Sequence, residues 1–237
     1  MKQLKTPCDL NSCMFCKGCV KEWLPVIAIN RKTLQVKKGE VIFEEGEDVN
    51  CMYFVNSGTV KVHKQWGEKE LIIRFAGETD IFGHRGLGED LVYPVSATAI
   101  EPCTICSVDI EFFNASLKVN PDFLYKLLVF FADELKISER RMRNLAHMPV
   151  KGRIANALLQ LQNKFGTSPA GNINLLLRRQ DLAAYAGTTY ETVFRVLNEL
   201  MELNLLKVED KAITIHNQEE LIKVINEGSN GGVKGGS

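Results

Sequence analysis

The sequence predicts an α+β fold in which a β-rich N-terminal half, one long helix and a small helical C-terminal domain follow one another. Three observations predict it. Apolar and polar residues alternate between residues 34 and 110, steps of four and three residues replace that alternation after Pro121, and two short helical segments flank Gly187. With 237 residues, the chain is long enough for two folded units and a connector.

The composition is that of a globular protein without a charge bias. Its 29 basic residues balance its 29 acidic residues, so contact with nucleic acid would need a local basic patch. No apolar run is long enough to span a bilayer, and the residues after Met1 lack the apolar stretch of a secretory signal. We therefore expect a cytoplasmic protein with no membrane partner, whose seven cysteines do not form a disulfide framework.

Residues 26–118 carry the pattern of a small antiparallel sandwich or barrel, and a cysteine-rich segment at residues 1–25 precedes them. Short apolar runs are separated by glycines at intervals of roughly ten residues, which is typical of strands joined by turns. The runs that we expect to be strands are residues 41–43, 52–55, 59–62, 71–75 and 104–108.

A long helix is expected at residues 119–148, with Pro121 in its first turn and Pro149 at its end. Its apolar residues follow the a/d pattern of a coiled coil over about three heptads. The residues of this seam are Leu124, Leu128, Phe131, Leu135, Ser138, Met142 and Leu145. Because so narrow a seam suits one partner helix better than a sheet, we expect a homodimer interface. The alternative is a helix that packs only on its own domain.

Residues 149–228 are expected to form a winged helix-turn-helix domain, and a disordered glycine-rich tail is expected at residues 229–237. Gly187 can take the left-handed conformation that the turn needs, and Thr188 or Thr189 can cap the second helix of the pair. The expected elements are helices at residues 150–165, 179–185 and 189–203 and strands at residues 205–208 and 212–215.

The second helix of the pair carries groups suited to DNA on its outer face. Arg195 could pair bidentately with guanine, and Glu191 could accept a hydrogen bond from cytosine N4. Two arginines before the first helix are placed for phosphate contact. The residues expected to contact double-stranded DNA are Arg178, Arg179, Thr189, Tyr190, Glu191, Phe194 and Arg195. The alternative is an ordinary helix pair with a salt-bridged surface.

This order of domains, with the run Glu191-Thr192-Val193-Phe194-Arg195-Val196-Leu197, resembles the Crp/Fnr superfamily of bacterial transcription regulators from about Cys8 to about Ile215. The resemblance implies a double-stranded β-helix similar to cyclic-nucleotide-binding domains, a dimer that works with RNA polymerase, and no enzymatic activity. It also implies that Glu191 and Arg195 recognise a TGA core in each half of an inverted repeat. Phe194 stands where relatives often carry Gly or Ser, which leaves the outer bases open.

The β-domain departs from the superfamily members that bind cyclic AMP. Those hold the ribose with Gly-Glu and the cyclic phosphate with Arg-Ser, whereas His84 and Val95 stand where the Glu and the Arg would be. A buried phosphate without its charge-assisted arginine bonds loses its best partner. We therefore expect no cyclic nucleotide as effector, although Arg85 could approach a phosphate from the other side.

The N-terminal segment offers a different effector chemistry. Cys8, Cys13, Cys16 and Cys19 form a C-x4-C-x2-C-x2-C run, and soft thiolates at this spacing can surround one metal centre. Four thiolates suit zinc, and the C-x2-C-x2-C part is similar to the ligand run of iron–sulfur ferredoxins. The alternative is a group of cysteines that bind no metal.

The Fnr branch of the superfamily holds an oxygen-labile [4Fe-4S] cluster with three N-terminal cysteines and one distant cysteine on a strand. The resemblance implies the ligands Cys13, Cys16, Cys19 and Cys106, with Cys8 as a substitute, although the family's usual run has a wider last gap. It also implies control by oxygen or nitric oxide. The alternatives are a zinc-stabilised segment and a haem-binding regulator with His63, His84 or His147 as axial ligand.

Overall fold

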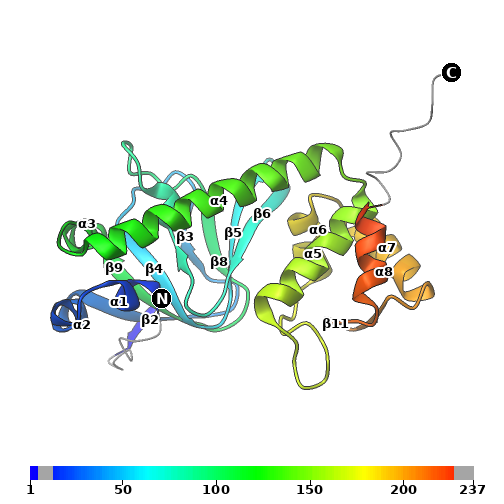
Figure 1. The fold of residues 1–237 in the computed structure, drawn as a ribbon, viewed down its shortest axis with the longest axis horizontal. Coiled ribbons are helices and arrows are strands. Elements are labelled where there is room, and N and C mark those ends of the chain that lie inside the picture. The colour runs from blue at the N-terminus through cyan, green and yellow to red at the C-terminus, as the bar shows by residue number, and fades with distance from the viewer. Residues whose placement is uncertain (5–12, 227–237) are drawn as a thin grey trace. The chain divides into compact units, whose positions relative to one another are not determined.

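The computed structural model describes residues 1–4 and 13–226. The chain divides into two compact units, Met1–Leu135 and Lys136–Ser237, and helix α4 (Pro121–His147) runs from the first into the second (Figure 1). Cys8 and the expected tail at residues 229–237 lie outside the described residues.

The N-terminal unit is built on two antiparallel sheets. Their strand orders are β1-β2-β9-β4-β7 and β3-β8-β5-β6, so most neighbouring strands are distant in sequence, as in a jelly roll. The strands are β1 (Lys2–Leu4), β2 (Arg31–Val36), β3 (Val41–Phe43), β4 (Cys51–Ser57), β5 (Val60–Trp66), β6 (Lys69–Ala76), β7 (Ile81–Phe82), β8 (Ser96–Ala99) and β9 (Cys103–Asp109). The predicted β-rich domain is confirmed, and each predicted strand overlaps one of these.

Short helices and α4 pack against the β-rich core. They are α1 (Met14–Gly18), η1 (Lys21–Trp23), α2 (Leu24–Asn30), η2 (His84–Gly86) and α3 (Ile110–Val119). Phe15 of α1 and Phe123 of α4 are fully buried in the core cluster that contains Phe54 of β4. Sequence periodicity did not predict α1, α2 or α3, because helices of five to ten residues carry too few turns for a 3.6-residue pattern.

The C-terminal unit is a helical domain with a two-stranded wing. After the end of α4 come α5 (Val150–Phe165), α6 (Arg179–Ala186), α7 (Tyr190–Glu202), β10 (Leu206–Glu209), β11 (Ala212–Ile215) and α8 (Gln218–Asn226). The predicted helices and wing are confirmed, whereas α8 was not predicted. Leu221 and Val224 of α8 are buried, and this helix packs on α5. Among the described helices, none has the length and apolarity needed to cross a membrane.

Candidate nucleic-acid interface and cysteine site

The turn between α6 and α7 has the geometry that a helix-turn-helix requires. Gly187 adopts φ 64° and ψ 48°, the left-handed conformation that costs a glycine little. Thr189 is the N-cap of α7, and its Oγ1 accepts a hydrogen bond from the backbone N–H of Thr192 at 3.3 Å. Both features were predicted from the sequence.

Helix α7 separates an apolar inner face from an outer face that is open to solvent. Val193, Val196 and Leu197 are buried, as expected, together with Leu182 and Ala186 of α6. The outer face presents Tyr190 at 43% exposure and Phe194 at 45%, with the side chain of Arg195 70% exposed. A side chain must be exposed in this way if it is to enter the major groove.

Glu191 is held in its charged form at the first turn of α7. Hydrogen bonds from its own backbone N–H and from the Thr189 hydroxyl lower the pKa of this carboxyl group. The carboxylate is therefore a pure hydrogen-bond acceptor at neutral pH, which suits the amino group of cytosine.

Arg195 is held loosely and can be redirected toward DNA. Its Nη1 is 3.1 Å from Oε1 of Glu199, one helical turn further on, and Nζ of Lys151 is 3.5 Å from Oε2 of the same carboxylate. Exposed ion pairs of this kind contribute at most about 1 kcal/mol. Breaking the pair to reach a guanine therefore costs little, and Lys151 remains beside Glu199.

Two arginines lie at the start of α6, and one of them contacts the exposed face of α7. Arg178 is the exposed N-cap of α6, and the guanidinium of the following Arg179 lies over the ring of Phe194, with its Cζ 5.5 Å from the ring centroid. This contact is a cation–π interaction between the two helices. Arg179 and Phe194, two of the residues predicted to contact DNA, are thus in contact.

Arg153 of α5 ties two helix ends together and was missed by the sequence analysis. Its guanidinium donates to four backbone carbonyls: Leu145 at 3.3 Å, Met148 at 3.1 Å, Ala186 at 3.0 Å and Gly187 at 3.1 Å. The first two close α4, and the last two close α6. An arginine on an amphipathic helix carries no motif that would reveal this role.

The predicted seam of α4 is largely exposed within a single chain. Leu124, Leu128, Leu135 and Met142 are 48%, 64%, 61% and 65% exposed, and Ser138 and Leu145 are half-buried. The opposite face packs on the β-domain through buried residues such as Phe123. Packing on its own domain alone therefore does not account for the apolar stripe.

The prediction that Phe131 belongs to the dimer seam needs one correction. It is half-buried, and its ring meets the edge of the His84 imidazole at 5.5 Å between centroids, inside its own unit. This position therefore packs partly on the β-domain, because the narrow a/d pattern does not resolve which side of the stripe a neighbouring domain covers.

The three described N-terminal cysteines lie in and at the two ends of the five-residue helix α1. Cys13 is the N-cap of α1 and its Sγ accepts from the backbone N–H of Cys16 at 3.5 Å, while Cys19 is the C-cap. All three are buried, at 1%, 4% and 9% exposure. The sequence spacing of two residues between cysteines thus places all three along one short helix.

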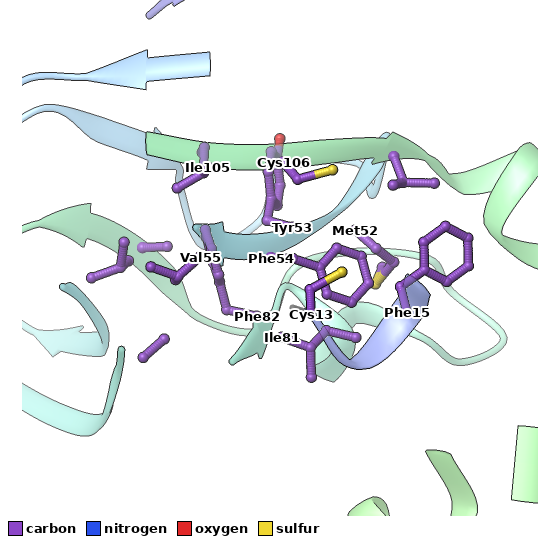
Figure 2. Close-up of a cluster of buried hydrophobic side chains, with 14 of the residues drawn as sticks. Cys13, Phe15, Met52, Tyr53, Phe54, Val55, Ile81, Phe82, Ile105 and Cys106 are labelled. Carbon is purple, nitrogen blue, oxygen red and sulfur yellow. The ribbon is translucent and has the colours of Figure 1, made fainter. Parts of the chain in front are cut away.

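Strand β9 presents Cys106 on the face of the sheet that α1 covers. Cys106 pairs directly with Phe54 of β4, so their side chains share one face. Phe15 of α1 stacks on Phe54 with ring centroids 5.5 Å apart. Figure 2 shows Cys13, Phe15, Phe54 and Cys106 in the same buried cluster.

This donor set fits an iron–sulfur cluster in type, number and burial. Burial first, and then the neighbouring Cys13, raise the pKa of the Cys19 thiol to about 12, so a positive metal centre would be needed to hold the thiolate. Within the described residues, no three His, Cys, Asp or Glu side chains converge closely enough to hold one metal ion.

The two other described cysteines take different positions. Cys103 lies three residues before Cys106 and so on the other face of β9, where its thiol donates to the carbonyls of Thr59 at 3.3 Å and Glu101 at 3.2 Å. Cys51 is half-buried at the start of β4. Cys103 therefore serves as a matched control for substitutions at Cys106.

A cluster of charged side chains occupies the part of the β-domain that faces α4. Oε2 of Glu134 lies 2.9 Å from Nη2 of Arg85, and Oε1 lies 3.3 Å from Nη1 of Arg74. His84, which is 2% exposed, has its Nε2 3.8 Å from Oε2 of Glu134, and Val95 is also buried. The chain thus pairs its own carboxylate with the arginines that could otherwise meet a phosphate.

Glu134 is the charged centre of this cluster. Burial opposes its ionisation, but His84, Arg74 and Arg85 more than offset burial and lower its pKa to about 2. Burial is also the largest cause of the lowered pKa of His84, so that imidazole is neutral at pH 7.

Glu134→Gln should therefore destabilise the chain by about 2 kcal/mol at pH 7, with less effect in acid. Because the folded pKa lies below the unfolded value of 4.5, the stabilisation is complete above pH 4.5 and is lost as the pH falls toward 2. Urea unfolding at pH 7 and pH 3.5 measures both losses. Glu139→Gln, at an exposed position of α4, is the control; an equal loss in the two variants would contradict the assignment.

The predicted haem ligands lie in three different settings. His63 has Nε2 2.9 Å from Oγ1 of Thr98 and Nδ1 3.0 Å from Glu70, so both ring nitrogens already have partners. His84 is buried between aromatic rings, including Phe130 at 4.9 Å. His147 is exposed at the end of α4. The three side chains lie on different elements.

Comparisons with known proteins match both units. Residues 33–120 match the cyclic nucleotide-binding domain, and residues 152–224 match the Crp-like helix-turn-helix domain. The chain is 31% identical over 179 residues to the cAMP-activated global transcriptional regulator CRP of Pasteurella multocida, covering 74% of this chain and 85% of that protein. The chain belongs to the Crp/Fnr superfamily of transcription regulators. It is accordingly a DNA-binding regulator rather than an enzyme.

Three further proteins are similar over much of the chain. The anaerobic regulatory protein of Aggregatibacter actinomycetemcomitans is 26% identical over 193 residues, which cover 80% of this chain and 74% of that protein. The structure of FixK2 from Bradyrhizobium japonicum has a TM-score of 0.75 at 26% identity and covers 82% of this chain and 96% of that one. A CooA mutant from Carboxydothermus hydrogenoformans, at 21% identity and a TM-score of 0.73, shares the fold over 94% of this chain and 97% of that one.

Proposed function

We propose that this Crp/Fnr protein is a homodimer that binds an inverted repeat with a TGA-like core and is controlled by an oxygen- or nitric-oxide-sensitive [4Fe-4S] cluster. The observation that carries the sensor assignment is the burial of Cys13, Cys16 and Cys19 on one helix that packs over the sheet face bearing Cys106. RNA polymerase is the partner expected of a regulator in this superfamily.

The exposed stripe on α4 supports the dimer. Leu124 and Leu128 of that stripe also line an apolar groove of about 420 Å³, together with Leu87, Leu91 and Leu117. A second copy of α4 would remove both surfaces from water, and apolar burial is the main favourable term in association. A two-fold axis would then repeat the recognition helix, which is what an inverted repeat requires.

Recognition of the half-site falls to the outer face of α7. Glu191, ionised at neutral pH, is the acceptor for a cytosine amino group, and Arg195 is the donor pair for a guanine. Arg178 and Arg179 are proposed to hold the phosphate backbone, which fixes the register of the helix without selecting bases.

The cysteine segment contacts the dimer helix directly. The rings of Phe15 and Phe123 of α4 lie 5.3 Å apart, and the backbone N–H of Val20 donates to Oδ1 of Asn120 at 2.8 Å. A Cβ on Gly18 would lie 2.4 Å from the ring of Phe123, so the two segments fit closely. A shift of α1 would therefore change how α4 packs against the β-domain.

A bound cluster would be an oxygen-labile link between the α1 segment and strand β9. The thiol groups of Cys13, Cys16, Cys19 and Cys106 would hold it, and the aromatic rings around Phe15 would exclude water from it. Through their contacts with Phe123 and Asn120, movements of the cysteine segment would move α4 and so change the dimer interface. Such a ligand shifts the equilibrium only because it binds the two arrangements differently.

Anaerobic purification of the full chain tests this proposal. We expect brown protein with about four iron and four sulfide per chain, which dimerises and binds an inverted repeat without air and loses both properties on exposure to oxygen. Cys106→Ala should lose the visible absorption, whereas Cys103→Ala should keep it.

Three outcomes would refute the cluster. They are stoichiometric zinc, colourless protein that keeps full DNA affinity in air, and a Soret band that survives substitution of the cysteines and identifies haem instead. None of them would overturn DNA binding by α7, which is tested separately.

A further inference from the structure

Phe194 is a large side chain without a polar group on the outer face of the recognition helix. Its neighbours there are Glu191, three residues earlier, and Arg195, and it is 45% exposed. A phenyl ring offers no hydrogen-bond donor or acceptor to a base edge. Leaving the ring in water has a cost, because burying apolar surface is favourable by about 25 cal/mol per Å².

The ring of Phe194 is also held in place. Arg179 of α6 covers it with Cζ at 5.5 Å from the centroid, so a cation sits on one side of the ring. On the inner side of α7, Val193 and Leu197 are fully buried, which fixes the rotation of the helix. The part of the ring that remains exposed thus points away from the protein, beside the proposed base contacts.

The apolar group that a base presents in the major groove is the C5-methyl group of thymine. One turn of an α-helix rises 5.4 Å, and one base-pair step of DNA rises 3.4 Å. Because these two lengths are similar, side chains one turn apart on a helix in the groove can contact base pairs that are close neighbours. An aromatic ring between Glu191 and Arg195 is therefore positioned for a thymine next to the pairs that these two residues contact.

We infer that Phe194 is a specificity-determining residue that recognises a thymine methyl group in each half-site, with Arg179 as the positioning residue that holds its ring. This inference rests on the proposed DNA binding by α7. It assigns the base selected next to the pairs that Glu191 and Arg195 are proposed to contact.

The test begins with selection of a preferred site by the full chain, purified anaerobically, from duplexes with randomised inverted half-sites. We expect thymine at one position next to the core in both halves. Replacing that thymine with uracil, which removes only the methyl group, should weaken binding about fourfold per half-site. Placing 5-methylcytosine rather than cytosine there should strengthen it again.

Two variants separate the roles of the residues. Phe194→Ala should bind thymine and uracil duplexes equally, while it still discriminates against changes in the core. Arg179→Met should keep part of the preference for the methyl group and bind less tightly, with a slope of log affinity against log salt that is smaller by about one.

A selected site without thymine at these positions, or equal binding of thymine and uracil duplexes by the unaltered chain, would overturn the inference. Retention of the uracil penalty in Phe194→Ala would do so too. If Glu191→Ala and Arg195→Ala also leave core specificity unchanged, the proposed DNA contacts of α7 fail as well, so the two failures can be told apart.

Discussion

Arg195→Ala and Glu191→Ala are each expected to relax specificity at one base pair of the half-site by about 1–3 kcal/mol. Both side chains lie on the exposed face of α7. The pair that Arg195 forms with Glu199 lies within the same exposed helix face and contributes at most about 1 kcal/mol to stability. In a dimer the loss occurs in both half-sites, which makes this the largest expected effect on DNA affinity.

The measurement is equilibrium binding of the full chain to the selected repeat and to repeats with single core changes. Each variant should lose affinity for the selected site and bind one altered base pair nearly as well as the original. Glu219→Ala, at an exposed position on α8, controls for the loss of a surface charge. Unchanged discrimination in a folded variant would refute the assignment of that residue.

Arg153→Met is expected to destabilise the C-terminal unit by about 3 kcal/mol. Its guanidinium donates to four carbonyls at the ends of α4 and α6, where the last turn of a helix leaves carbonyls without intrahelical donors. Methionine keeps much of the length of the side chain but removes every donor, so the helix ends lose their shared partner.

Urea unfolding of the full chain measures this loss of stability. DNA affinity should fall as well, because the destabilised unit carries the recognition helix. Arg153→Lys should recover only part of the stability, because an ammonium group cannot reproduce the planar fork that reaches four acceptors. Arg195→Ala provides the contrast, with reduced DNA specificity at unchanged stability. Equal stability of Arg153→Met and the unaltered chain would contradict the proposed role.

The sequence alone predicted the elements whose signals are local and repeated. Apolar residues recur every second position in residues 34–110 and every three to four positions after Pro121. These spacings arise because a strand or a helix buries one of its faces. Gly187 and Thr189 were found because a left-handed turn and an N-cap each favour particular residue types. The outer face of α7 followed from the same periodicity.

The sequence predicted the candidate sites only in part. The sequence showed cysteines at close spacing, but not that α1 would pack over Phe54, which is the residue paired with Cys106. It assigned Phe131 to a partner, whereas the tertiary structure places part of its ring against His84. Both facts depend on which surfaces meet after distant segments fold together.

What the sequence determined by itself is the family, the order of the domains and the recognition helix, because these depend on residue type and spacing within one element. Only the tertiary structure decided that Glu134 sits among Arg74, His84 and Arg85, and that Arg153 joins the ends of α4 and α6. The physical reason is that charge pairing and hydrogen bonding act between groups close in space, whatever their separation along the chain.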